Sequence, residues 1–232
     1  MYFYNPYFGS VDIDVVGPSL RGEFYDTIEK YERSHGYEII QSDPLGLEVS
    51  ASKPIYSRTK RKIGDMEIDA CSYEQTGASA FHEDGSKLLP YSLCDQDVNR
   101  RLVTLGRNSV CYSPSRALLM LYKIKARRDR TCDARTKGAT MDPSRLEWLR
   151  GKIVKDGSDI IALLDDSQRG RTAILNEPLD LDRLGRMARE HQIDRITEQT
   201  LREVLNDNAA LELYGRPINT ESILSSIEKV FQ

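Results

Sequence analysis

The chain lacks any long apolar run. Among its 232 residues, no stretch approaches the roughly 20 apolar residues that a helix needs to cross a bilayer. Its first residues, MYFYNPYF, have neither the basic start nor the small-residue cleavage site of a signal peptide. Of all residues, 39% are hydrophobic and 30% are charged, which is typical of a soluble globular protein. We therefore predict a cytoplasmic protein with no membrane partner.

Histidine and cysteine are also scarce. The four cysteines and three histidines lie far apart in the chain, at Cys71, Cys94, Cys111, Cys132, His35, His82 and His191. They form no CxxC pair and no zinc knuckle, and no Ser-His-Asp or Cys-His pattern indicates a hydrolase. The net charge is −3, so a nucleic-acid partner would have to bind a local basic patch.

The spacing of apolar residues divides the chain into a mixed half and a helical half. It predicts strands over 11–16, 37–41, 45–50, 53–58, 62–73, 102–106 and 109–113, and an amphipathic helix over 22–36. It then predicts a helix over 114–130 capped by Ser113, a loop over 131–142, and helices over 143–150, 152–166, 178–191, 197–206 and 219–231. We predict an α+β fold with a mixed β-sheet and a flanking helix in residues 1–113 and a helical domain in residues 114–232.

Acidic residues alternate with apolar ones in two of the predicted strands. Asp12 and Asp14 share one face of the first strand, and Glu67 and Asp69 share one face of the segment MEIDAC. Neighbouring carboxylates repel each other unless a cation neutralises them, and Mg²⁺ prefers such oxygen ligands. If the two strands pair, three carboxylates could hold two metal ions, which activate an attacking oxygen and stabilise a leaving pyrophosphate. The alternative is a solvated face of a half-covered sheet.

Four segments, in this order, resemble the nucleotidyltransferase superfamily and, within it, the AbiEii/MenT-like toxin family. They are GSVDIDVV at 9–16, the MEIDAC strand, SPSRALLMLYKIKARRDR at 113–130 and KDGSDIIALL at 155–164. The first is similar to the family's metal-binding strand, and the second places a third carboxylate. The third is similar to the family's helix with a nucleotide-contacting lysine, and the fourth is similar to its K-D-x-x-D-I motif. No single motif is specific, and their order carries the resemblance.

The resemblance implies a nucleotidyltransferase-like sheet domain and a role for each matching residue. Asp12, Asp14 and Asp69 would hold two Mg²⁺ ions and act in catalysis. The nucleotide would be contacted by Ser10, Lys123 and Lys155, and Asp156 would position the acceptor or act as a general base. The implied reaction moves a nucleoside monophosphate from an NTP to an acceptor hydroxyl. The tRNA 3′ end is the implied acceptor, and the protein would be the toxin of a toxin–antitoxin system with a cognate antitoxin.

The chain departs from the family pattern before its first acidic strand. Family members carry a GG or GS turn and a short helix about ten residues before D-x-D, whereas Gly9 and Ser10 lie directly before Val11. We therefore expect the chain to lack the first strand, the phosphate-binding turn and most of a helix. Two alternatives remain open. One is a catalytically inactive module of this fold that binds RNA or protein, and the other is a transferase that modifies a small molecule such as an antibiotic.

Two basic segments are candidates for contact with RNA phosphates. They are RTKRK at 58–62 and KIKARRDR at 123–130, although such runs are usually solvated surface. Arg127, Arg128 and Arg130 point around more than one helical face. Only part of this charge can therefore point at one ligand.

Overall fold

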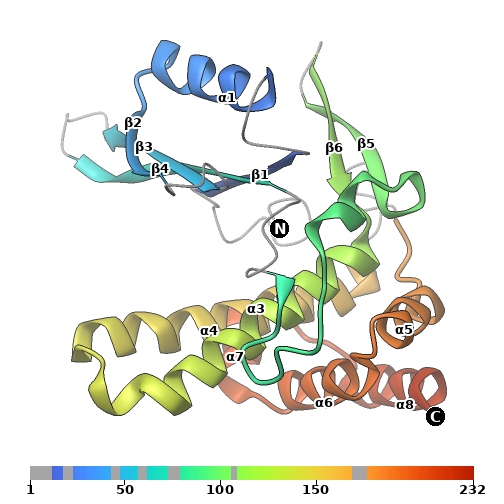
Figure 1. The fold of residues 1–232 in the computed structure, drawn as a ribbon. Helices are drawn as coiled ribbons and strands as arrows, with labels where there is room; N and C mark the ends of the chain where they lie inside the picture. The colour runs from blue at the N-terminus through green and yellow to red at the C-terminus, as the bar shows by residue number, and fades with distance from the viewer. Residues whose placement is uncertain are drawn as a thin grey trace. The chain divides into compact units, whose positions relative to one another are not determined.

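The chain forms two compact units of helices and strands (Figure 1). The computed structural model describes residues 12–17, 23–42, 48–56, 62–72, 79–105, 109–168 and 177–232. We call the described residues of Phe8–Ser79 and Pro90–Ser92 the sheet unit, and those of Ala80–Leu89 and Leu93–Gln232 the helical unit. The predicted mixture of helices and strands is thereby confirmed. The contacts divide the chain near residues 79 and 93, and the predicted domain boundary at 113 stays a prediction.

The sheet unit contains four strands in the order β1-β4-β3-β2. Their bounds are β1 (Asp12–Gly17), β2 (Glu38–Ser42), β3 (Glu48–Tyr56) and β4 (Lys62–Ser72). β1 runs parallel to β4, and the other two pairs are antiparallel. Along β4, the buried Ile68 and Ala70 alternate with the partly exposed Glu67 and Asp69. β4 therefore presents apolar side chains to one face of the sheet and acidic side chains to the other.

Helix α1 (Glu23–Ser34) follows β1 in the chain and lies along the sheet (Figure 1). It ends just before Gly36, whose φ of 75° few other residues adopt readily. The Nδ1 of His35 lies 2.8 Å from the carbonyl oxygen of Tyr31 in the last turn. The prediction that the helix ends at Gly36 is confirmed.

One strand prediction in the sheet unit is wrong. The sequence predicts separate strands over 45–50 and 53–58, but β3 is continuous and passes through Pro54. Pairing of β3 with β2 reaches only Ser52, so Pro54 pairs with β4 alone. Because no second strand among the described residues pairs with β3 there, the missing N–H of proline costs no described bond on that side.

The helical unit combines a β-hairpin with a helical bundle. The hairpin strands are β5 (Arg100–Leu105) and β6 (Ser109–Pro114), which pair antiparallel. The helices are α3 (Arg116–Lys137), α4 (Pro143–Leu164), α5 (Leu181–Glu190), α6 (Asp194–Leu205), α7 (Asn208–Tyr214) and α8 (Thr220–Phe231). Short 3₁₀ turns are η1 (Tyr91–Asp95), η2 (Asp97–Asn99), η3 (Gly138–Thr140) and η4 (Asp166–Gln168). The hairpin belongs to the helical unit, since it pairs within itself and not with the four-stranded sheet.

Helices α3 and α4 pack side by side and supply much of the core of the helical unit (Figure 1). Leu118, Leu121 and Ile124 of α3 are fully buried, as are Ile160 and Ile161 of α4. Asp142 caps α4 by accepting hydrogen bonds from the backbone of the next turn, and a proline occupies its first position. This pair of helices carries a group of charged residues between them.

Three helix predictions are wrong, and one helix was not predicted. The N-cap of α3 is Ser115 and not Ser113, because Pro114 is the last residue of β6. The helix continues to Lys137 through the expected loop, where it buries Cys132. α4 runs without a break through Gly151, and α7 was not predicted. Burial of Cys132 favours the continuation of α3 beyond Arg130 over the local preference for a loop.

None of the described helices is long and apolar enough to cross a membrane.

Candidate functional site

The parallel pairing of β1 with β4 brings the two acidic strands together. Asp14 lies opposite Asp69, and Asp12 lies opposite Glu67. Asp14 is exposed and Asp69 is partly exposed, so the backbone presents two carboxylates at neighbouring positions about 4.8 Å apart across the ladder. The condition set for a shared site, that the two strands pair, is therefore met. Ser10 and the side chain of Asp12 lie outside the described residues.

The chemistry of this pair fits a hard cation. Carboxylate oxygens at adjacent positions repel each other, and Mg²⁺ is bound by one or two such groups with water and phosphate oxygens. Within the described ranges, no group of three or more histidine, cysteine or acidic side chains is close enough to hold a metal ion. Of the predicted set of Asp12, Asp14 and Asp69, two members have described side chains, and the two-metal site stays a prediction.

A second group of candidate residues lies between α3 and α4 in the helical unit. The Nζ of Lys123 lies 2.9 Å from Oδ2 of Asp159 and 3.7 Å from Oδ1 of Asp156. The side chains of Asp156 and Asp159 are 3% and 1% exposed, whereas 21% of the Lys123 side chain is exposed. The lysine therefore covers two buried carboxylates.

Two further cations complete this group. Arg130 forms an ion pair with Asp156, and the Nζ of Lys155 lies 3.4 Å from Oδ2 of Asp159. The side chains of Arg130 and Lys155 are 32% and 33% exposed. We call these five residues the ion-pair cluster: Lys123, Arg130, Lys155, Asp156 and Asp159. Its carboxylates are buried and its cations reach the surface, so a solvent-borne ligand meets an excess of positive charge.

The charge of Lys123 is maintained by its surroundings. Burial by itself lowers the pKa of the Lys123 ammonium. The charges of Asp159 and Asp156, with the hydrogen bond to Asp159, outweigh that effect and the opposing charge of Arg130, and raise the pKa above its ordinary value. Lys123 is therefore a fixed cation at neutral pH and not a proton acceptor.

One atom of the cluster has no hydrogen-bond partner among the described residues. It is Oδ1 of Asp159, which is fully buried. Leaving such an acceptor unsatisfied costs about 1–3 kcal/mol. The two lysines on Oδ2 of the same carboxylate offset part of that cost. The arrangement is consistent with a structural link between the helices and also with a site that accepts a donor from a ligand.

The structure brings together three of the predicted site residues, Lys123, Lys155 and Asp156, and it adds Arg130. Sequence analysis assigned no role to Arg130 in this group, although it follows Lys123 by seven residues and thus lies on the same helical face. Its neighbours point elsewhere. Arg127 binds Asp207, and Arg128 binds Glu83. The prediction that only part of the basic segment can address one ligand is confirmed.

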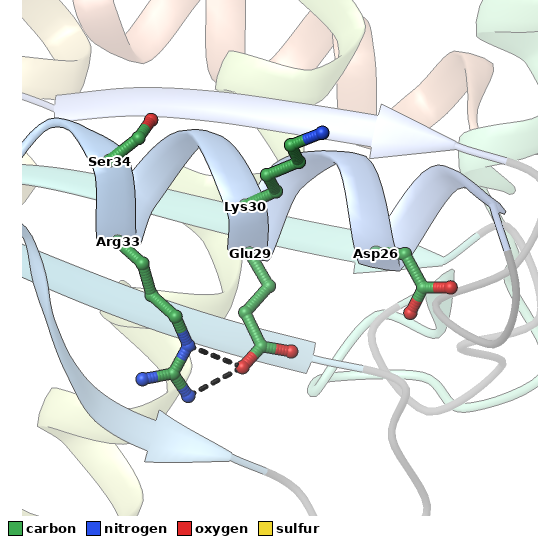
Figure 2. A pocket seen from close by; sticks show the side chains of 5 residues that line it. All are labelled: Asp26, Glu29, Lys30, Arg33 and Ser34. Atoms are coloured by element: carbon green, nitrogen blue, oxygen red, sulfur yellow. Dashed lines mark hydrogen bonds and ion pairs between the residues drawn. The ribbon is translucent and has the colours of Figure 1, made fainter.

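A surface depression beside α1 gathers no functional set of side chains. Figure 2 shows its lining residues, Asp26, Glu29, Lys30, Arg33 and Ser34, all from one helix. Arg33 already forms an ion pair with Glu29, four residues earlier. None of the predicted site residues whose side chains the structure describes lines this depression.

The candidate residues thus form two groups in two units. Asp14 and Asp69 belong to the sheet unit, and the ion-pair cluster belongs to the helical unit. Comparison with protein-family models, with curated proteins and with solved structures finds no match to the chain. The function proposed below therefore rests on the residues and on the resemblance of the four segments.

Proposed function

We propose that the protein is a nucleotidyltransferase that moves a nucleoside monophosphate from an NTP to an acceptor hydroxyl and releases pyrophosphate. The observation that carries the proposal is the parallel register that sets Asp14 opposite Asp69. With Asp12 two residues before Asp14, these are the ligands that Mg²⁺ takes in proteins. When bound, Mg²⁺ would supply charge neutralisation at the phosphates and activation of the attacking hydroxyl.

The resemblance of segments 113–130 and 155–164 assigns the phosphates and the acceptor to residues of the ion-pair cluster. Lys123 remains protonated because of its carboxylate neighbours, so its charge is available to the triphosphate without a change of protonation. Lys155 would add a second ammonium, which is a third exposed. Asp156 would position the acceptor hydroxyl as a hydrogen-bond acceptor. Its own orientation is held by Lys123 and Arg130.

The acceptor and the biological setting rest on the resemblance of the four segments. We propose the tRNA 3′ end as the acceptor and a toxin–antitoxin system as the setting, with a cognate antitoxin as partner. The net positive charge that the cluster presents to solvent supports an anionic substrate of this kind.

Transfer of label from each α-labelled NTP to total tRNA, with magnesium, tests the reaction. Asp14→Asn and Asp69→Asn are expected to lower the rate by about 100-fold or more, since each removes a charge at the metal. Lys123→Met is expected to lower it as well. Asp26→Asn removes an exposed carboxylate of α1 and is the matched control with an unchanged rate.

Two results would contradict the proposal. One is transfer that survives Asp14→Asn and Asp69→Asn unchanged. The other is no transfer to tRNA or to small hydroxyl acceptors by the unaltered chain, which would favour an inactive binding module. The base of the labelled nucleotide that is transferred would identify the preferred NTP.

A further inference from the structure

A tryptophan with two cations against its ring lies on the surface of α4. Trp148 is the one tryptophan of the chain, and the residue is 45% exposed. The guanidinium carbon of Arg145 lies 4.0 Å from the centre of the ring, and the Nζ of Lys152 lies 5.4 Å from it. The three residues are separated by three and four positions, so they share one side of the helix. We call them the aromatic stripe.

The aromatic stripe continues into the ion-pair cluster. Lys155 and Asp156 follow Lys152 by three and four residues, which keeps them on the same side of α4. Eight residues separate Trp148 from Asp156, which corresponds to about 12 Å along the helix axis. A flexible ligand on Trp148 can therefore extend to the cluster along one helix.

The charge of this segment is opposite to that of the chain. From residue 145 to 155 there are four basic residues, Arg145, Arg150, Lys152 and Lys155, against one acidic residue, Glu147. The whole chain carries −3. A polyanion would therefore be attracted to this part of α4 and repelled by the molecule as a whole.

Aromatic rings beside cations match the chemistry of a single nucleic-acid strand. A base stacks on an aromatic ring with about 1–3 kcal/mol, and arginine adds a cation–π contribution. Lysines beside the ring attract the phosphates. We propose that the aromatic stripe is a platform on which a base of single-stranded RNA stacks, with the strand running toward the ion-pair cluster. The inference rests on the proposed function in one respect: the bound strand is taken to be the acceptor of the nucleoside monophosphate.

The fluorescence of Trp148 reports its own site, because the chain has no other tryptophan. Titration with a single-stranded oligoadenylate is expected to quench it to a plateau, and the anisotropy of a labelled strand gives the affinity independently. Trp148→Leu is expected to weaken binding about 5- to 150-fold, which corresponds to the loss of one stacked base. Trp148→Phe keeps a ring and should retain most of the affinity.

The contribution of the phosphates is measured separately. Lys152→Gln is expected to lower the slope of log affinity against log salt by about 0.7, the value for one phosphate contact on a single strand. Lys229→Gln removes the same charge from an exposed position on α8 and should leave the affinity and the slope unchanged.

Four results would overturn the platform. They are no binding of the strand, binding without quenching, binding that Trp148→Leu leaves unchanged, and equal affinity for double-stranded RNA. Self-association that Trp148→Leu abolishes would also overturn it, because the surface would then bind protein. Strand binding through Trp148 with no nucleotidyl transfer would instead contradict the proposed function and leave the platform standing.

Discussion

The Nζ of Lys123 lies 2.9 Å from Oδ2 of Asp159, and this ion pair joins α3 to α4 through their shared core. The aspartate is almost completely buried, whereas the lysine keeps one side at the surface. A buried carboxylate needs a partner to offset the loss of its hydration. The contact therefore contributes to stability while leaving the cation accessible to a ligand.

A double-mutant cycle on this pair should show strong coupling. Asp159→Asn is expected to destabilise the protein by about 1–3 kcal/mol, less than for an isolated buried pair because Lys123 keeps Asp156. Combined with Lys123→Met in urea unfolding, the coupling energy should exceed about 1 kcal/mol. The exposed pair of Glu29 and Arg33 is the control, with coupling below about 0.5 kcal/mol. Equal coupling in both pairs would contradict the buried network.

The stability that Lys123 contributes should be lost at alkaline pH. Its pKa in the folded protein is raised above the ordinary value of 10.5 by Asp159 and Asp156, against the effects of burial and of Arg130. Because the pKa of Lys123 is raised in the folded protein, its contribution to stability is complete below pH 10.5. That contribution declines as the pH rises through the pKa of the folded protein. The difference in unfolding free energy between the unaltered chain and Lys123→Met should therefore stay constant from pH 7 to about 9.5 and shrink above 10.5. A difference that grows in that range would refute the assignment.

Glu32 of α1 should destabilise the sheet unit at neutral pH. Its carboxylate is fully buried and has no hydrogen-bond partner among the described residues. Burial raises the pKa of Glu32, the charge of Glu29 adds to the rise, and Arg33 opposes it. The pKa of Glu32 is higher in the folded chain than in the unfolded chain. The stability that the protonated carboxyl contributes is therefore fully present below pH 4.5, and it is lost as the pH rises through the folded pKa.

Glu32→Gln is accordingly expected to stabilise the protein at pH 7 by about 1 kcal/mol, since it removes a buried charge without changing the shape. The gain should vanish near pH 4, because the glutamate is then protonated and the glutamine that replaces it carries no charge. Glu29→Gln changes the same charge at a more exposed site and should alter stability by less than about 0.5 kcal/mol. Thermal unfolding of the unaltered chain, Glu32→Gln and Glu29→Gln at pH 7 and pH 4 measures these differences in stability.

Two glycines of α4 should respond to alanine in opposite directions. A Cβ at Gly157 would lie 2.6 Å from Nη1 of Arg127 and 2.9 Å from Cβ of Ala210, and Arg127 is fixed by Asp207. Gly157→Ala should therefore destabilise the protein by about 1–3 kcal/mol.

At Gly151 an added Cβ meets nothing within 4 Å. Gly151→Ala should stabilise the protein by up to about 1 kcal/mol, because alanine favours the helix. Urea unfolding of both variants measures the two effects. A stabilising Gly157→Ala would show that α4 and α7 do not pack as described.

Local patterns in the sequence were enough to predict most elements. The end of α1 at Gly36 and the start of α4 at Pro143 depend on residues within one turn, so single-sequence reasoning finds them. The same reasoning fails at Gly151, where it favours a break. Burial of α4 against α3 and α7 keeps the helix continuous there, and a local pattern does not contain that information.

The sequence by itself determined which residues share a face. Alternation sets Glu67 and Asp69 on one side of a strand, and helical spacing sets Lys123 and Arg130 on one side of α3, because both periods are properties of the backbone. Only the tertiary structure decided which faces meet. The pairing of Asp14 with Asp69 and the burial of Asp159 beneath Lys123 join residues distant in the chain. Such pairs form because core packing and strand pairing of the folded chain outweigh the entropy of bringing distant segments together.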